Sequence, residues 1–264
     1  MKRFQFGKNW ISFLKNLSED RIINSKKSLL SMLGIGSLEG KSFLDIGSGS
    51  GLSSLSAKRA GANVYSYDYD MQSVECTKEL KRRYFNSNKD WKIEQGSILN
   101  EQYCKELGQF DVVYSWGVLH HTGNMYEALK NADICVKKDG YLFIAIYNDQ
   151  RLQSRIWTSI KKTYVQVPIS RPLLILFGYV IFWLPFFVLG LFQLNPFKRW
   201  KDYKKRRGMS PHHDLVDWMG GYPFEVAKPE EIIHFYLKMG YELKRLKTCG
   251  GRLGCNEFVF KKIK

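Results

Sequence analysis

Three glycines and an aspartate near the start of the chain have the types and spacing of a small-ligand site. The stretch Phe43-Leu-Asp-Ile-Gly-Ser-Gly-Ser-Gly-Leu52 predicts a short buried strand, a glycine turn and the start of a helix. The turn contains Gly47, Gly49 and Gly51. Because glycine has no Cβ, the backbone can bend sharply there and a ligand can come close. The free N–H groups of the following helix then face that ligand. Asp45 is predicted at the C-terminal end of the strand, where a carboxylate suits a cationic group better than a pyrophosphate.

A second acid follows at the distance expected for a nucleoside site. Asn63-Val-Tyr-Ser-Tyr-Asp68 predicts a strand that ends in a carboxylate. An acid about twenty residues after the turn can accept hydrogen bonds from both ribose hydroxyls of a nucleoside. The dinucleotide pattern G-x-G-x-x-G does not fit, because position 52 is Leu and the third glycine comes one residue early. The alternative interpretation is a generic glycine turn with a surface Asp.

Strands and helices alternate along the chain in a way that would position these residues. The pattern predicts an α/β fold with a doubly wound, mostly parallel seven-stranded sheet, because parallel neighbours need crossover helices. Predicted strands cover 43–46, 64–67, 91–95, 110–115, 141–147, 241–247 and 256–260, and predicted helices cover 52–60, 71–85, 126–136 and 229–239. The segment 137–140 is predicted to form a turn before the fifth strand.

The ordered motifs resemble those of the class I S-adenosylmethionine-dependent methyltransferases. Their first motif, hydrophobic-D-x-G-x-G-x-G, matches the glycine turn, and an acid closes the second strand as Asp68 does here. The stretch from Phe110 to Thr122 is similar to the fourth-strand motif of the small-molecule branch, which includes quinone-biosynthesis methylases. In the family, residues matching Gly96-Ser97-Ile98 approach the adenine, and Ser97 stands where Asp is commoner. The resemblance implies S-adenosyl-L-methionine as cofactor, bound by Asp45, Gly47, Ser48, Gly49, Gly51, Asp68, Tyr69, Ser97, Ile98 and Ser115.

The chain divides into a core and additions to it. We expect an N-terminal helical segment over 1–40, a cofactor-binding core over 41–148, a helical insertion over 149–228, and a C-terminal helix and strand pair over 229–264. The N-terminal helices are expected to pack on the sheet, and an alternative is that the segment ending at Trp10 roofs the cofactor pocket. The five cysteines form no C-x-x-C pair and no signal peptide precedes them, which indicates reduced thiols in the cytoplasm.

The insertion combines an apolar run over 172–194, a basic cluster over 198–207 and a His-rich loop over 209–224. The segment from Arg155 to Ser210 contains eleven Lys or Arg residues and one acid, Asp202, so it holds +10 of the net charge of +16. The run is long enough for one membrane crossing, but a single crossing would put strands of one sheet on opposite sides. Pro185 can split it into two arms that dip into one leaflet. We therefore expect 172–207 to contact an anionic membrane surface, with a hydrophobic lid or a subunit contact as the alternative.

Two histidine pairs are candidates for proton transfer from an oxygen acceptor. His120 and His121 follow the fourth predicted strand, and His212 and His213, with Asp214 next to them, follow the basic cluster. A base that titrates near neutrality suits removal of a hydroxyl proton. We predict that His121 lines the acceptor pocket and that His213 or Asp214 reaches into it, with hydrogen-bonded structural histidines as the alternative. Neither spacing matches a zinc signature, so no metal is expected.

The sequence thus predicts a methyltransferase that modifies the oxygen of a small or lipid-linked acceptor, in the cytoplasm or at a membrane. One alternative is an RNA methyltransferase that uses the basic cluster on phosphates. That alternative is weakened because the charge adjoins an apolar run and no RNA-binding module is visible. The other alternative is a protein that binds the cofactor without catalysis. The sequence leaves the acceptor, the methylated atom and the oligomeric state open.

Overall fold

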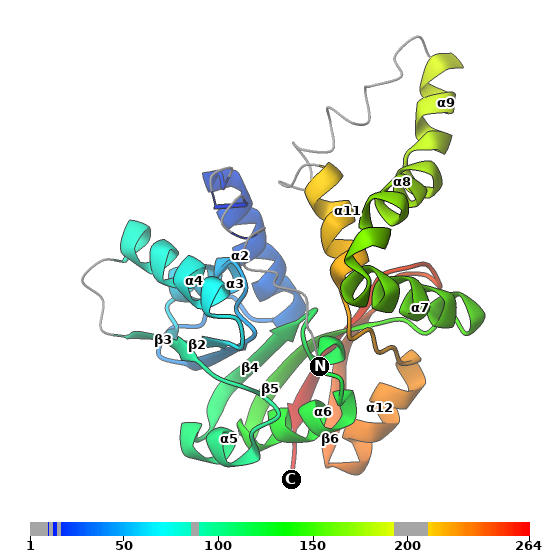
Figure 1. The fold of residues 1–264 in the computed structure, drawn as a ribbon. Coiled ribbons are helices and arrows are strands. Elements are labelled where there is room, and N and C mark those ends of the chain that lie inside the picture. Colours follow the sequence, from blue (N-terminus) through cyan, green and yellow to red (C-terminus); the bar gives the residue numbers. More distant parts are fainter. Residues whose placement is uncertain (1–9, 11–12, 15–16, 86–89, 193–210) are drawn as a thin grey trace.

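A seven-stranded sheet in the order β3-β2-β1-β4-β5-β7-β6 forms the centre of the protein. The computed structural model describes residues 10, 13–14, 17–85, 90–192 and 211–264. Neighbouring strands are parallel from β3 to β5, and β7 is antiparallel to β5 and β6. This arrangement confirms the predicted doubly wound, mostly parallel sheet (Figure 1). The strands are β1 (Ser42–Ile46), β2 (Asn63–Asp68), β3 (Trp91–Gln95), β4 (Phe110–Trp116), β5 (Val136–Tyr147), β6 (Tyr241–Lys247) and β7 (Cys255–Lys262).

Helices cover both faces of the sheet because its central strands carry apolar side chains on both sides. Phe43 packs in a core cluster with residues of α2, α3 and α4, whereas its neighbour Leu44 packs in a second cluster with residues of α5, α6 and α12. Figure 1 shows these two groups of helices on opposite sides of the sheet. The helices are α2 (Glu19–Leu33), α3 (Leu52–Arg59), α4 (Met71–Tyr84), α5 (Glu101–Leu107), α6 (Met125–Ile134) and α12 (Pro229–Lys238).

Two details of the core differ from the prediction. The segment 137–140, which was expected to form a turn, is part of β5. It forms a bulge there, because the register of β5 against β4 shifts between Phe110 and Val112. Asp139 takes up the bend with φ of 62°. The helix α5 was not predicted; the side chain of Asn100 begins it by accepting a hydrogen bond of 3.1 Å from the N–H of Tyr103.

The insertion between β5 and α12 has its own apolar cluster. It contains α7 (Leu152–Gln166), the short turn η2 (Pro168–Ser170), α8 (Arg171–Phe182), α9 (Leu184–Phe192) and α11 (Pro211–Gly220). The predicted His-rich loop over 209–224 is therefore helical from Pro211 to Gly220. The reason is tertiary packing, since Leu215 and Met219, one turn apart, face Gly178 of α8, where a Cβ would come within 2.6 Å of each.

The helices α8 and α9 extend away from the body of the protein (Figure 1). Among the described residues no single helix is long and apolar enough to span a bilayer, although α7 and the segment Pro168–Phe182, bent by 114°, meet the length and composition together. The basic cluster 198–207 and the end of the apolar run lie outside the described residues. Many large apolar side chains are exposed in this region, namely Ile169, Leu173, Leu176, Phe177, Val180, Ile181, Leu184, Phe187, Val188, Leu189, Leu191 and Phe192.

Candidate active site

The turn between β1 and α3 has the left-handed backbone for which its glycines are required. Gly47, Gly49 and Gly51 have φ of 74°, 54° and 81°. A Cβ at Gly47 would collide with the side chain of Val118, and one at Gly51 would lie 2.9 Å from the Cα of Thr77. Side chains are therefore excluded by conformation and by space. The turn is fixed in place because the N–H groups of Gly47 and Ser48 both donate to the carbonyl of Tyr67 on β2.

The indole ring of Trp10 lies against the same turn. A Cβ at Gly49 would come within 3.2 Å of Trp10 Nε1 and Cε2. Phe13 supports the indole edge-on, with ring centroids 5.9 Å apart. An aromatic side chain of the N-terminal segment therefore lies over the glycine turn. This is the position expected if that segment covers the cofactor pocket, the alternative given for it from the sequence.

Asp68 joins the end of β2 to the glycine turn. Its Oδ2 accepts a hydrogen bond of 2.9 Å from the N–H of Gly49, and its Oδ1 accepts one of 2.8 Å from the N–H of Asp70. Burial raises the pKa of this carboxyl to about 6, against the opposing effect of these main-chain bonds. Each oxygen has a second lone pair, so the carboxylate can still accept hydrogen bonds from two hydroxyls.

Asp45 is buried in β1 under the first turn of α3. It accepts a hydrogen bond of 2.5 Å from Ser54 Oγ, which is 2.7 Å from Ser66 Oγ, and Trp91 Nε1 donates to Ser66 at 2.9 Å. Burial, followed by the nearby charge of Asp68, raises the pKa of Asp45 to about 7, while the Ser54 bond opposes the shift. Two carboxyls with raised pKa values beside one glycine turn fit a positively charged ligand, because a nearby cation stabilises their ionised forms.

The other predicted cofactor residues have different surroundings. Ser48 Oγ lies 2.9 Å from Thr77 Oγ1, and Ser115 Oγ donates to the carbonyl of Ile46 at 3.1 Å, so both side chains brace the turn. Tyr69 is 60% exposed at the end of β2. Ser97 Oγ accepts from the N–H of Leu99 at 3.3 Å, and the side chain of Ile98 is buried in the core.

His121 lies in the short helix η1 (Leu119–His121), which follows β4. Its Nδ1 is 2.6 Å from the carbonyl of Pro223. A carbonyl only accepts, so Nδ1 carries the proton and Nε2 carries the lone pair. Burial lowers the pKa of His121 to about 4; the bond to Pro223 raises it in part, and the nearby Lys161 lowers it further. The imidazole is therefore neutral at pH 7 with its lone pair on Nε2, and burial holds its pKa below the near-neutral value that the sequence analysis expected of a base.

His120 packs beside it and is fully buried. Its Nδ1 accepts a hydrogen bond of 3.3 Å from the N–H of Tyr147, so Nε2 carries the proton. That Nε2 has no hydrogen-bond partner among the described residues. Burial lowers the pKa of His120 well below its usual range, with smaller contributions from His121 and Lys161. The two histidines therefore present opposite tautomers at the carboxyl ends of β4 and β5.

Lys161 of α7 is a buried residue of this region that the sequence did not single out. Its side chain is fully buried, and its Nζ donates to the carbonyl of Trp218. The same Nζ lies 3.7 Å from the centre of the Trp218 ring and 4.8 Å from that of Phe224. Burial lowers the pKa of Lys161 well below its usual range. The available signal was its spacing, since Trp157, Lys161 and Tyr164 recur at helical intervals on one buried face.

His213 and Asp214 lie on the first turn of α11, whereas His121 meets the far end of that helix. A Cβ at Gly221 would lie 3.0 Å from His121 Cε1. Gly221 lies seven positions after Asp214, which is about 10 Å along a helix axis. Only the backbone of His213 is described. The structure therefore brings His121 to Gly221 and not to the start of α11, and the roles of His213 and Asp214 stay predictions.

Among the residues that the structure describes, no three His, Cys, Asp or Glu side chains gather as metal ligands would.

Comparison with known proteins places this site in a family context. A family profile described as a methyltransferase domain matches residues 16–219. The ubiquinone biosynthesis O-methyltransferase of Pelagibacter ubique is 26% identical over 156 residues, which cover 58% of this chain and 62% of that protein. The enzyme of the same name from Bordetella avium is 28% identical over 114 residues, covering 43% and 45%. The chain thus spans less than two thirds of the length of these relatives.

Solved structures share the fold at low sequence identity. Magnesium protoporphyrin IX methyltransferase from Synechocystis, solved with bound SAH, superposes with a TM-score of 0.54 at 14% identity, over 94% of this chain and 86% of that one. A SAM-dependent methyltransferase from Aquifex aeolicus has a TM-score of 0.51 at 13% identity, over 96% and 97%.

Proposed function

The chain belongs to the methyltransferase-domain family, and we propose that it transfers the methyl group of S-adenosyl-L-methionine to a hydroxyl oxygen of a small or lipid-linked acceptor. The observation that carries this proposal is the placement of Asp68 on the glycine turn, with the buried Asp45 behind it. Asp68 can accept from ribose hydroxyls, and the two carboxyls favour a cationic ligand. The likeness to ubiquinone biosynthesis O-methyltransferases supports an oxygen acceptor.

The residues near His121 supply the acceptor side of the reaction. The bound cofactor provides a sulfonium methyl group with a neutral leaving group, so the protein contributes mainly alignment. His121 Nε2 is the nitrogen that takes the proton lost by the acceptor hydroxyl. The carbonyl of Pro223 then stabilises the imidazolium that forms, because Nδ1–H already donates to it. His213 and Asp214 remain second candidates on the acceptor side, and replacing each by Ala tests them through turnover.

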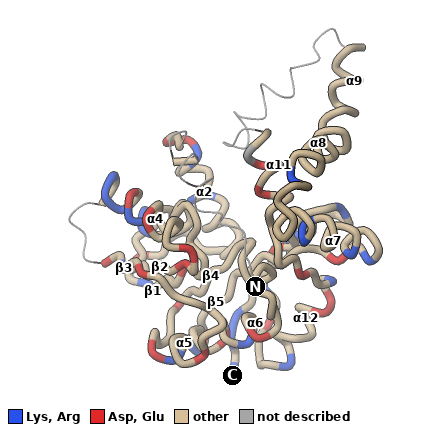
Figure 2. The backbone as a smooth tube through the Cα atoms, viewed as in Figure 1, with Lys and Arg blue, Asp and Glu red and all other residues tan. Residues whose placement is uncertain are grey.

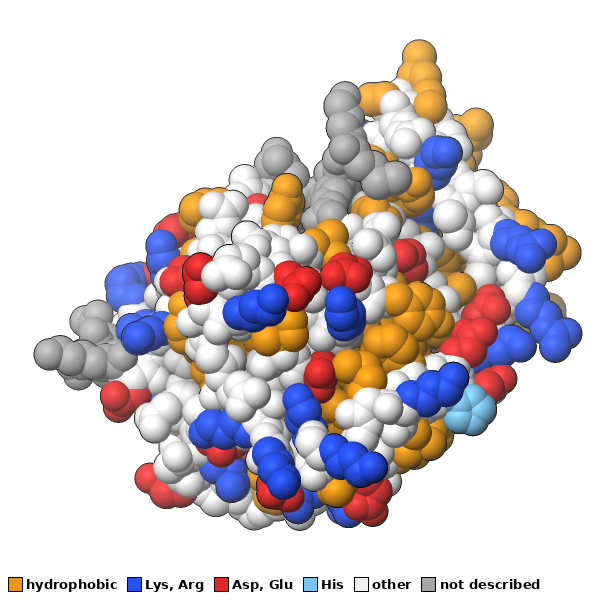
Figure 3. Space-filling model, turned by 90° about the horizontal axis from the view of Figure 1, so that it is seen from below, with side chains coloured by type: hydrophobic (Ala, Val, Ile, Leu, Met, Phe, Trp, Pro, Cys, Tyr) orange, Lys and Arg blue, Asp and Glu red, His pale blue; other side chains and the backbone are white. Residues whose placement is uncertain are grey.

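Two measurements on the whole chain test this function. Calorimetry with S-adenosyl-L-methionine should show binding, and a nicotinamide dinucleotide should show none. Incubation with radiolabelled cofactor and separate lipid, polar and RNA extracts should then label a lipid or polar compound. Label in RNA would favour an RNA methyltransferase instead, and tight cofactor binding without label in any extract would favour a protein without catalysis. Figure 3 shows basic and acidic side chains interspersed on the face turned away from α9, with no single-sign surface there for RNA.

We also propose that α8 and α9 dip into one leaflet of an anionic membrane and so bring the site to a lipid-linked acceptor. Phe187, Val188 and Leu189 are consecutive in α9 and are 38%, 42% and 57% exposed. Successive helix residues point about 100° apart, so α9 is apolar on every side. A helix that docks on a protein needs only one apolar stripe, whereas an all-round apolar surface suits lipid.

Charge and topology support this membrane contact. No charged residue occurs from Pro172 to Phe192, and Figure 2 shows α9 without charged residues. Arg171 precedes the run, and the sequence of 198–207 adds seven Lys or Arg. Such residues each contribute about 1 kcal/mol near an anionic surface. Because α7 and α11 pack on the same body, the chain returns to the side that it left, which favours a dip over a crossing.

A further inference from the structure

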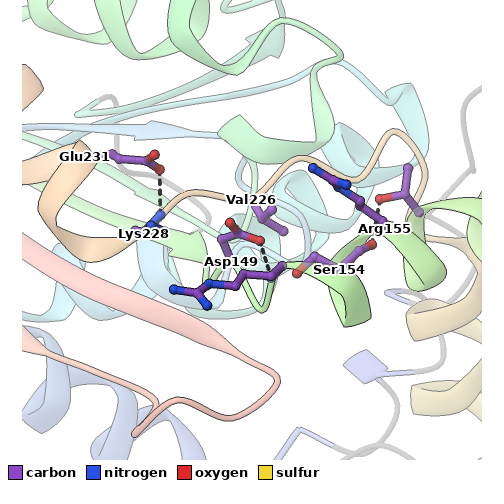
Figure 4. A pocket seen from close by; sticks show the side chains of 8 residues that line it. Asp149, Ser154, Arg155, Val226, Lys228 and Glu231 are labelled. Atoms are coloured by element: carbon purple, nitrogen blue, oxygen red, sulfur yellow. Dashed lines mark hydrogen bonds between the residues drawn. The ribbon is translucent and has the colours of Figure 1, made fainter.

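A pocket of about 470 Å³ opens where α7 and α12 both begin (Figure 4). None of the residues that line it was predicted to bind the cofactor or the acceptor. The lining combines basic, hydroxyl and acidic side chains with one apolar residue: Asp149, Arg151, Ser154, Arg155, Thr158, Val226, Lys228 and Glu231. Its volume is within the range of about 300–1,000 Å³ that is usual for small-molecule sites.

The acidic side chains of the pocket are engaged with the backbone. Asp149 Oδ1 accepts a hydrogen bond of 2.8 Å from the N–H of Arg151, and Glu231 Oε2 accepts one of 2.8 Å from the N–H of Lys228. Both bonds fix the segments that lead into the two helices (Figure 4). No ion pair joins Arg151, Arg155 or Lys228 to another residue in the described part of the chain. The three basic groups outnumber the two acids and are available to a ligand.

The backbone adds to this positive field. Arg151 and Lys228 are the residues that precede the first turns of α7 and α12, helices of 15 and 10 residues. Each helix start carries a partial positive charge on its unpaired N–H groups. In α12 the first residue is Pro229, which has no N–H, so the start of α7 supplies most of this effect. Together with two guanidinium groups and an ammonium group it favours an anion with several oxygens, because guanidinium groups bind phosphate through paired N–H donors.

The pocket is tied directly to the carboxyl end of β5. The N–H of Asp149 donates to the carbonyl of Ala227 at 3.1 Å, and the N–H of Ala227 donates to that of Tyr147 at 3.0 Å. Tyr147 ends β5, and its ring lies 5.4 Å from the ring of His121, centroid to centroid. Val226 lines the pocket and also packs against the aromatic cluster around Trp157 and Phe224. An anion held here is therefore a neighbour of the proposed acceptor site.

We propose that this pocket binds a phosphate or diphosphate group of the methyl acceptor, held by Arg151, Arg155 and Lys228. The inference rests on the proposed function, because it assigns an anionic end to the acceptor of that same reaction. The pocket is larger than one phosphate group needs, so part of the attached molecule enters with it. A soluble phosphate ester and a lipid-linked diphosphate offer the same chemistry to these side chains.

Direct titration of the whole chain with inorganic pyrophosphate, followed by phosphorus NMR or calorimetry, tests the pocket. We expect saturable binding by the unaltered protein and a loss of about 10- to 100-fold in affinity for the double variant Arg151→Gln, Arg155→Gln. Lys162→Gln removes an exposed charge from the same helix and should leave the affinity unchanged. Unchanged melting temperatures would show that the variants fold. Absence of saturable binding, or equal losses in the double variant and the control, would overturn the proposal.

Two further arms identify the source of the phosphate. A short prenyl diphosphate in solution is compared with neutral vesicles that carry a long-chain polyprenyl diphosphate. Binding that depends on Arg151 and Arg155 in either arm supports the pocket and names its source, and failure in both arms counts against it. Cofactor binding is measured separately by calorimetry. If the cofactor binds and pyrophosphate does not, only the pocket assignment fails; if pyrophosphate binds and the cofactor does not, the proposed function fails.

Discussion

The carboxylate of Asp68 accepts a hydrogen bond of 2.9 Å from the main-chain N–H of Gly49, so an acid at the end of β2 holds the glycine turn after β1. Parallel pairing places Asp45 beside Ser66 and Ile46 beside Tyr67, which brings the ends of β1 and β2 to the same edge of the sheet. The turn and the acid therefore form one unit. A ligand that enters this edge meets both at once.

Replacing Asp68 by Asn should weaken cofactor binding by about 10- to 100-fold. The amide oxygen of Asn can still accept from one of the two main-chain N–H groups, that of Gly49 or that of Asp70, but not from both. The second bond is lost together with the charge that strengthens hydrogen bonds to ribose hydroxyls, at about 1.5–3 kcal/mol. Calorimetry with S-adenosyl-L-methionine measures the change.

The matched control for that variant is Asp70→Asn. Asp70 caps α4 by accepting from the N–H of Gln72 at 3.0 Å, and Asn is an equally good cap. Its cofactor affinity should equal that of the unaltered chain. Equal losses in both variants would refute the assignment of Asp68.

Cofactor binding should release protons below neutral pH. The pKa values of about 7 for Asp45 and about 6 for Asp68 leave part of these carboxyls protonated at pH 6. A cation favours their ionised forms, so binding expels protons and the affinity rises as pH increases through this range. Calorimetry at pH 6 in two buffers with different ionisation enthalpies counts the protons.

At pH 8 the same experiment should show almost no release, because both carboxyls are then ionised before the ligand arrives. Asp45→Asn should reduce the release at pH 6. Heats that are independent of the buffer at pH 6 would contradict the assignment.

Replacing His121 by Gln should lower kcat by about 10²- to 10⁴-fold and leave cofactor affinity unchanged, because Gln cannot accept the hydroxyl proton. The pH profile of kcat should lose its acidic limb in the variant. His234→Gln is the control, since His234 is exposed on α12. If turnover of His121→Gln stays normal, the base is another group.

Gly49→Ala should destabilise the chain by about 1–2 kcal/mol, because its φ of 54° is left-handed. The added Cβ also lies 3.2 Å from Trp10, so the substitution should displace the indole and lower cofactor affinity. Gly36→Ala is the control, because a Cβ at Gly36 would meet no heavy atom within 4 Å and the residue has no positive φ. Thermal unfolding and calorimetry compare the two variants. Equal effects of the two substitutions would contradict the requirement for glycine at position 49.

Flotation with liposomes that contain anionic lipid tests the membrane contact. We expect the unaltered chain to float and the double variant Val188→Lys, Leu191→Lys to stay in the soluble fraction, since both side chains are exposed on α9. Leu237→Lys with Leu246→Lys alters two exposed apolar residues of the body and should still float. Failure of the unaltered protein to float at low salt would end this proposal.

The strands and the glycine turn were predictable because their signals are local. A buried run such as 43–46 marks a strand by its apolar side chains, and Gly47, Gly49 and Gly51 mark a turn that other residues cannot adopt. The family resemblance, which the profile match confirms, rested on the same local motifs in the right order. The helix α11 was missed because its start is polar and only its packing on α8 makes Leu215 and Met219 core residues.

Sequence alone thus determined the sheet, the turn and the acid at the end of β2, since each follows from residues within a few positions of one another. Only the tertiary structure decided the tautomer of His121, through the carbonyl of Pro223 that lies 102 residues later. The tertiary structure also decided that Lys161 is buried against Trp218. It likewise brought together the starts of α7 and α12, whose residues line the pocket of Arg151, Arg155 and Lys228. These features depend on contacts between distant parts of the chain, and no local pattern of residue types encodes which distant groups will meet.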